Sequence, residues 1–163
     1  MKPLLVIGLG NPLMGDEGVG WHVADRLAAD PRLPADAEVV CGGTDLLRYA
    51  DQMDQRRRVI VVDALQDDAE PGSVSMWEEP SGPGGPSGAG ASACQSLPKL
   101  QNRQDNAHCL SAIQAIQLLR LTAPVPITLL GISIPCANVQ AGLSPALAAR
   151  MPAILGHVLR ALD

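Results

Sequence analysis

The stretch that most constrains the fold lies at the start of the chain, where residues 2–20 read KPLLVIGLGNPLMGDEGVG. Its apolar run, residues 4–7, predicts a buried strand that ends in a glycine-rich turn. Two acids, Asp16 and Glu17, follow at the expected beginning of a helix. A buried strand that leads through a glycine-rich turn into a helix N-terminus is the unit from which α/β proteins build their sites.

Two nucleotide-binding motifs do not fit this stretch. A dinucleotide-binding fingerprint needs a third glycine where Leu13 stands, and a P-loop needs Lys and then Ser or Thr where Asp16 and Glu17 stand. Two carboxylates would repel a phosphate. They favour a cation instead, because carboxylates are hard oxygen ligands for metals. An open alternative is that Asp16 is an N-cap and Glu17 a first-turn acid favoured by the helix dipole.

Composition narrows the class of protein. A chain of 163 residues with 47% hydrophobic residues predicts one globular domain over residues 1–163. The net charge of −5 and the aromatic content of 2% argue against a nucleic-acid or anionic-membrane partner. No apolar run reaches the roughly 18 residues of a membrane span, and the N-terminus enters the first strand without a signal-peptide pattern. We therefore expect a cytoplasmic monomer, and its four scattered cysteines should be reduced.

The remaining chain predicts an α/β fold. Strands are expected over residues 4–9, 38–41, 59–62, 73–77 and 126–134, and helices over residues 17–29, 46–49, 110–121 and 145–162. This order predicts a mostly parallel sheet of about five strands, with helices on both faces, one antiparallel edge, and the first and third strands near the centre. The Gly/Pro-rich residues 80–106 predict a flexible insertion within the domain, and Arg56–Arg58 a solvated lead-in to the third strand.

Three residues whose side chains commonly bind metals stand next to the ends of predicted strands or the start of a predicted helix. Glu17 follows the first strand, Asp63 follows residues 59–62, and His108 stands at a loop-to-helix junction. Because sites in α/β folds lie at the carboxyl edge of the sheet, we expect Glu17 and Asp63 to meet there, with the His108 helix closing the third side. Two oxygens and one nitrogen would leave open positions on a divalent transition metal. His22 would face about 140° away from Glu17 on a continuous helix.

With these residues identified, the chain resembles the nickel–iron hydrogenase maturation proteases. The match is spread over nearly the whole chain except the Gly/Pro-rich insertion. Its most specific part is the G-x-G-N-x-x-x-G-D-E-G-x-G run. The matching segments are residues 8–11 (GLGN), 15–20 (GDEGVG), 42–44 (GGT), 61–64 (VVDA), 71–72 (PG), His108, 129–132 (LLGI) and 142–145 (GLSP).

The resemblance implies a fold, a reaction and a site. The fold would be a three-layer α/β/α sandwich of the phosphorylase/hydrolase-like type. The activity would be that of an endopeptidase that removes the C-terminal extension of a nickel–iron hydrogenase large-subunit precursor after nickel insertion. The nickel-recognising trio falls on Glu17, Asp63 and His108, and Asp16 matches the family's other acid. The implied catalytic residues are Asp16, Glu17 and Asp63. Nickel would come with the substrate, and zinc or cadmium could occupy the same donors.

Two departures and several alternatives stay open. Cys41 stands where the family commonly has an acid, and the insertion before His108 is unusual. Either the metal polarises the scissile carbonyl or activates water, or Asp16 acts as base on a water in aspartic-protease fashion. A non-catalytic nickel-sensing or chaperone module would need the same trio. A relative of the spore-protease type would mature another protein.

Overall fold

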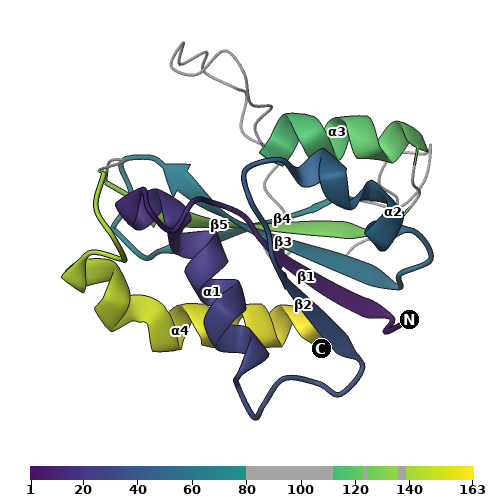
Figure 1. Ribbon diagram of the computed structural model, residues 1–163, viewed down its shortest axis with the longest axis horizontal. Coiled ribbons are helices and arrows are strands. Elements are labelled where there is room, and N and C mark those ends of the chain that lie inside the picture. The colour runs from purple at the N-terminus through teal and green to yellow at the C-terminus, as the bar shows by residue number, and fades with distance from the viewer. Residues whose placement is uncertain (80–111, 123–124, 136–138) are drawn as a thin grey trace, which may run out of the picture.

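The computed structural model describes residues 1–79, 112–122, 125–135 and 139–163 (Figure 1). The expected insertion over residues 80–106 lies outside the described residues. The strands are β1 (Leu4–Gly8), β2 (Ala37–Cys41), β3 (Arg58–Gln66), β4 (Val74–Glu79) and β5 (Ile127–Ile134). The helices are η1 (Gly15–Gly18), α1 (Val19–Ala28), η2 (Leu46–Tyr49), α2 (Ala50–Met53), α3 (Ala112–Thr122) and α4 (Pro145–Leu162).

The five described strands form one sheet in the order β2-β1-β3-β5-β4. β4 pairs with β5 in the antiparallel sense, and the other pairs are parallel. The central place of β3, with β1 beside it, confirms the predicted sheet. The carboxyl ends of β1, β2, β3 and β5 therefore share one edge, which is where an α/β fold can assemble a site.

Helices cover both faces of the sheet, as expected. Figure 1 shows α1 and α4 on one face and α2 and α3 on the other. Along β1 the side chains alternate between the two layers. Leu4 and Val6 pack in the core under α1 and α4, while Leu5 and Ile7 pack in the core under α3 and η2. The result is the three-layer α/β/α sandwich.

Two glycines let α1 lie directly on the sheet. A Cβ on Gly20 would stand 2.3 Å from the carbonyl oxygen of Val62 and 2.4 Å from that of Leu9. A Cβ on Gly8 would stand 2.0 Å from the carbonyl oxygen of Gly20. Any side chain at either position would separate helix from strand. The glycines of the first motif therefore serve close backbone packing, which sets the position of the turn that carries Glu17.

Two predicted boundaries are wrong. The third strand was expected to stop at Val62, but β3 continues to Gln66 because β5 pairs with it through Ile134. The first helix was expected from Glu17, but α1 begins at Val19 and η1 precedes it. Gly15, with a φ of +57°, starts this tighter turn, and glycine adopts that conformation without strain.

The sequence predicts a cap at Ser144 for the last helix and at Thr44 or Asp45 for the short helix after residue 45, and the structure has caps at Ser144 and Asp45. Ser144 accepts a hydrogen bond from the Leu147 N–H at the start of α4, where Pro145 takes the first helical position. Asp45 accepts one from the Leu47 N–H at the start of η2. Among the described residues, no helix combines the length and the apolar character needed to cross a bilayer.

The basic run before β3 is not uniformly solvated, which corrects the sequence interpretation. Arg56 is 8% exposed. Its guanidinium donates to the carbonyl oxygens of Gln52 at 2.8 Å and Lys2 at 2.5 Å, and it forms an ion pair with Glu38 at 2.8 Å. Arg56 therefore joins the N-terminus, α2 and β2 at the amino edge of the sheet.

Arg56→Ala is expected to lower the free energy of unfolding by about 1–3 kcal/mol, because two partly buried hydrogen bonds to backbone carbonyls and the ion pair with Glu38 are lost. Arg57→Ala is the matched control, since the Arg57 side chain is 66% exposed, and it should change stability by less than about 0.5 kcal/mol. Urea denaturation followed by circular dichroism measures both. Equal stabilities of the two variants would contradict this role of Arg56.

Candidate active site

Two carboxylates meet where β1 ends. β1 stops at Gly8, which is paired with Val62, so the next residue of β3, Asp63, has a strand neighbour only on the β5 side. η1 carries Glu17 and contacts β3. The turn between β1 and η1 is close, since a Cβ on Gly10 would stand 2.5 Å from the Glu17 carbonyl oxygen. The fold thus places Glu17 and Asp63 at the same edge of the sheet, near enough for the Glu17 charge to act on the pKa of Asp63.

The pKa of the Asp63 carboxyl is raised well above its usual value. Burial raises the pKa of its carboxyl from 3.8 to about 7, a hydrogen bond from the Ala64 N–H to Oδ1 at 2.8 Å opposes the rise, and the neighbouring Glu17 carboxylate adds to it. Burial is the larger cause, and the Glu17 charge adds a smaller one that also disfavours ionisation of Asp63. A partly buried acid whose pKa is raised toward neutral pH beside a second acid is typical of sites that bind cations or transfer protons.

The ring of Trp77 packs beside Asp63. The sequence alone does not predict this contact. Asp63 is paired with Gly131 of β5, and a Cβ at Gly131 would stand 2.7 Å from Cζ3 of Trp77. The Trp77 ring therefore fills the space that a side chain at position 131 would take. A glycine inside an otherwise apolar strand was the available signal, since it marks a close approach by another group.

Asp16 has a partner that sequence spacing did not reveal. Asp16 is 6% exposed, and its Oδ1 accepts a hydrogen bond from the backbone N–H of Ser144 at 2.7 Å. Asp16 caps neither η1 nor α1, because neither helix has a side-chain cap. The carboxylate instead ties the turn after β1 to the first residue of the α4 cap, which corrects the N-cap interpretation.

The predicted nitrogen ligand, His108, lies outside the described residues. Within the part of the chain that the structure describes, no three His, Cys, Asp or Glu side chains form a metal-holding group. His22 packs its ring edge-on to Trp21, with centroids 5.3 Å apart. Burial and Arg26 lower the pKa of His22, against an opposing effect of Asp25. The described donors for a cation at this edge are therefore the carboxylates of Glu17 and Asp63.

A cavity of about 370 Å³ opens at the same edge, between the ends of β1 and β2. The described residues that line it are uncharged and include Gly10, Asn11, Trp21, Cys41 and Thr44. Partial burial and the nearby Asp25 raise the pKa of the Cys41 thiol, so this side chain is neutral at neutral pH. The cavity thus offers a neutral lining beside the acidic pair.

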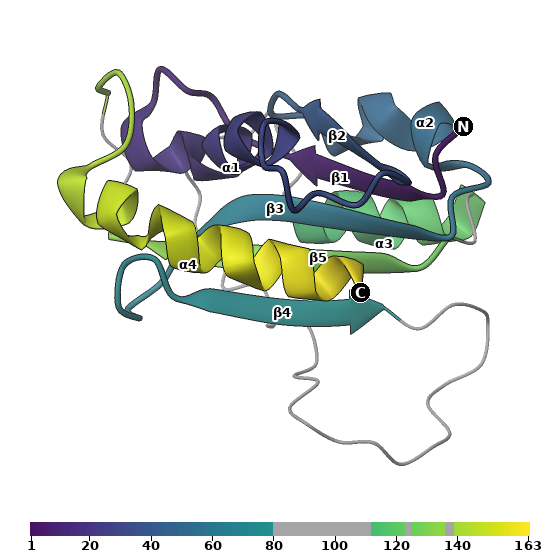
Figure 2. The same ribbon diagram turned by 90° about the horizontal axis from the view of Figure 1, so that it is seen from below.

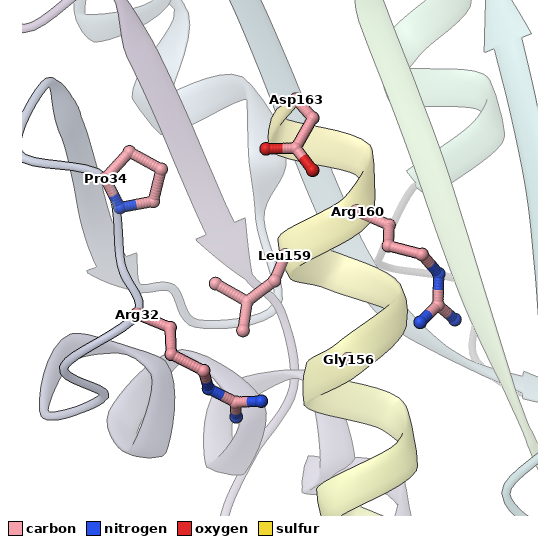
Figure 3. A pocket seen from close by; sticks show the side chains of 6 residues that line it. All are labelled: Arg32, Pro34, Gly156, Leu159, Arg160 and Asp163. Atoms are coloured by element: carbon pink, nitrogen blue, oxygen red, sulfur yellow. The ribbon is translucent and has the colours of Figure 1, made fainter.

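A second hollow, of about 330 Å³, lies away from these residues (Figure 3). It is formed by the end of α4 and the segment that leads into β2, with Arg32, Leu159 and Arg160 among its lining residues. Those elements meet at the amino edge of the parallel strands. Glu17 and Asp63 lie at the opposite edge, so this hollow is not part of the candidate site.

Comparison with known proteins finds similarity to hydrogenase maturation proteins. A family model described as hydrogenase maturation protease matches residues 21–81. The chain is 35% identical over 71 residues to the hydrogenase expression/formation protein HupD of Rhodobacter capsulatus, covering 44% of this chain and 34% of that protein. It is 34% identical over 62 residues to the hydrogenase 2 maturation protease of Escherichia coli, covering 38% of each. The chain spans 34% to 48% of the lengths of the curated relatives it matches, which is less than half.

The similarity to solved structures extends over the whole chain. The hydrogenase maturating endopeptidase HybD from E. coli superposes with a TM-score of 0.75 at 27% identity, covering 99% of this chain and 92% of that one. The [NiFe] hydrogenase maturation protease HybD from Thermococcus kodakarensis has a TM-score of 0.64 at 22% identity and full coverage of both chains, which supports the fold.

Proposed function

We propose that the chain is a hydrogenase maturation protease, and specifically the endopeptidase that removes the C-terminal extension of a nickel–iron hydrogenase large-subunit precursor; its similarity to such proteins supports this. The observation that carries the proposal is the pair Glu17 and Asp63 at the carboxyl edge of the sheet, in which burial and the second carboxylate raise the pKa of Asp63 to about 7. An open cavity of about 370 Å³ lies at the same edge of the sheet, and its lining includes Gly10, which packs against the backbone of Glu17.

Nickel enters this proposal as part of the substrate. The donor set supports it in part: Glu17 and Asp63 offer two oxygens, and His108 is proposed as the nitrogen donor. Such a set leaves room for ligands from the precursor, so that only a metallated precursor would be held in place. When bound, nickel would supply a Lewis acid that polarises the scissile carbonyl or activates a water.

Asp63 and Glu17 lie in different environments, which suit them to different roles. Asp63 can bind or release a proton near neutral pH, because its pKa is about 7. Its hydrogen bond from the Ala64 N–H fixes the direction of the carboxyl group. Glu17 stands on a turn that Gly8 and Gly20 hold against the sheet, so its carboxylate is positioned by backbone packing. Preorganisation of this kind is what a hydrolytic site requires.

Asp16 is less suited than this pair to act as a base on water. A general base must reach the proton that it accepts. Asp16 is 6% exposed, and one carboxylate oxygen is already occupied by the Ser144 N–H. These contacts favour the metal-assisted route over the aspartic-protease route, with Asp16 as a positioning residue for the turn that carries Glu17.

Asp16→Asn tests this distinction. Asn retains an oxygen that accepts the Ser144 N–H, so cleavage should stay within about tenfold of wild type, whereas loss of a general base would cost about 10²–10⁴-fold. Asp16→Ala removes the acceptor and should lower the free energy of unfolding by about 1–3 kcal/mol. Cleavage rates and urea denaturation measure the two effects. A loss of cleavage in Asp16→Asn as large as that in Glu17→Gln would assign the catalytic role to Asp16.

A non-catalytic nickel-sensing or chaperone module is the second candidate, since it would use the same donors. The intact mass of the precursor distinguishes the two after incubation of nickel-loaded precursor with this protein. Loss of a short C-terminal peptide supports the endopeptidase. A stable complex in which the precursor keeps its full mass supports the binding module and contradicts the proposed activity.

A further inference from the structure

Two exposed aliphatic side chains stand on adjoining loops at the carboxyl edge. Leu13 is 67% exposed, and Val139 is 83% exposed. Their loops run side by side, as Figure 2 shows at the end of the molecule where α1 and α4 begin. The Gly15 N–H donates to the Gln140 carbonyl oxygen at 2.8 Å, and the Gly142 N–H donates to the Pro12 carbonyl oxygen at 3.4 Å. We call Leu13 and Val139 together the apolar rim.

The apolar rim is tied to the turn that carries Glu17. The Glu17 N–H donates to the Met14 carbonyl oxygen at 3.3 Å, directly after Leu13 in the chain. On the other loop, the Ser144 N–H donates to Asp16 Oδ1 at 2.7 Å. One backbone hydrogen bond and one bond to the Asp16 carboxylate therefore hold the two loops against η1. The apolar rim therefore borders the candidate site. The same contacts that position η1 also hold the two loops that expose Leu13 and Val139.

The absence of charge around the apolar rim indicates which kind of polypeptide it can bind. Residues 11–15 (NPLMG) and 139–142 (VQAG) contain no charged residue, and the neighbouring cavity lining is uncharged as well. Scattered exposed aliphatic residues are ordinary on a protein surface. Here, however, two of them border the point that a scissile bond must reach, so the polypeptide on either side of that bond must pass over this edge.

We propose that the apolar rim docks an uncharged, aliphatic segment of the precursor next to its scissile bond. This inference rests on the proposed function, because it takes the precursor as the occupant. Burying the two side chains against such a segment removes apolar surface from water without disturbing the acidic pair. The rim would thus contribute binding of the substrate, in both the ground state and the transition state, and no chemistry.

The test compares a double variant, Leu13→Ser with Val139→Ser, with wild type in cleavage of the nickel-loaded precursor. Loss of binding that is uniform along the reaction raises KM and leaves kcat in place. We expect KM to rise at least about tenfold, with kcat within about twofold and an unchanged melting temperature. Leu121→Ser is the matched control: Leu121 is 82% exposed on α3, near the amino edge where β5 begins, and its KM should equal that of wild type.

Each other outcome is decisive. An unchanged KM in the double variant, with wild type active, overturns the docking surface and leaves the proposed function standing. A wild-type dimer in sedimentation velocity that the double variant abolishes would assign the rim to a second copy of the chain and would also overturn it. If wild type cleaves no nickel-loaded precursor, the proposed function fails, and the docking surface falls with it.

Discussion

Glu17→Gln is expected to abolish processing of the precursor, with a loss of about 10²–10⁴-fold in the cleavage rate. Gln keeps the size of the side chain and leaves the packing of η1 unchanged, since the turn is held by the glycine contacts and not by the carboxylate. What it removes is the negative charge that would meet a cation beside Asp63. Single-turnover cleavage of nickel-loaded precursor, followed by intact mass, measures the effect.

The control for this variant is Glu70→Gln, which removes a carboxylate of the same type from an exposed ion pair with Arg150. An exposed pair of this kind contributes little to stability, so this variant should cleave at the wild-type rate. Retention of wild-type cleavage by Glu17→Gln would remove Glu17 from the site. A melting temperature of Glu17→Gln far below that of Glu70→Gln would show that Glu17 acts in folding instead.

Asp63→Asn is expected to abolish cleavage and at the same time to stabilise the apoprotein at alkaline pH. The folded-state pKa of about 7 lies above the reference value of 3.8, so between these values the folded state binds a proton that the unfolded chain releases. Wild-type stability therefore falls as pH rises from about 4 to 7 and is level above that range. Asn avoids this cost, retains Oδ1 for the Ala64 N–H and removes the repulsion from Glu17.

Urea denaturation at pH 4 and pH 8, in the presence of a chelator, measures this difference. At pH 8 the variant should be more stable than wild type by up to about 4 kcal/mol, the free energy that corresponds to a pKa shift of about three units. At pH 4 the two proteins should differ little, because Asp63 is protonated in the folded wild type. Equal stability at pH 8 would contradict the raised pKa of Asp63.

The residues that the sequence places correctly are those governed by local pattern. The apolar runs of β1 and β3 identify central parallel strands, and the acids after them fall at one edge because parallel strands end together. Ser144 and Asp45 act as caps because capping depends on neighbouring N–H groups. The resemblance to hydrogenase maturation proteases rests on the same local motifs and is confirmed by comparison of the whole fold.

The features that the sequence does not reveal depend on distant contacts. Asp16 reads as a cap, yet it binds Ser144, 128 positions away along the chain. Arg56 reads as part of a solvated basic run, yet it lies between Lys2 and Glu38. Trp77 lies in the edge strand as predicted, but the sequence does not show that its ring covers Gly131 beside Asp63. In each case a tertiary partner overrides the local pattern, and no spacing rule names that partner.

The most direct test of the central claim is the dependence of cleavage on nickel carried by the precursor. Large-subunit precursor from the same cell is prepared in nickel-loaded and nickel-free forms, incubated with this protein, and analysed by intact mass. The account predicts loss of a short C-terminal peptide from the loaded form alone, because Glu17 and Asp63 would hold the substrate through its metal. Equal cleavage of both forms, or cleavage of neither, would contradict it.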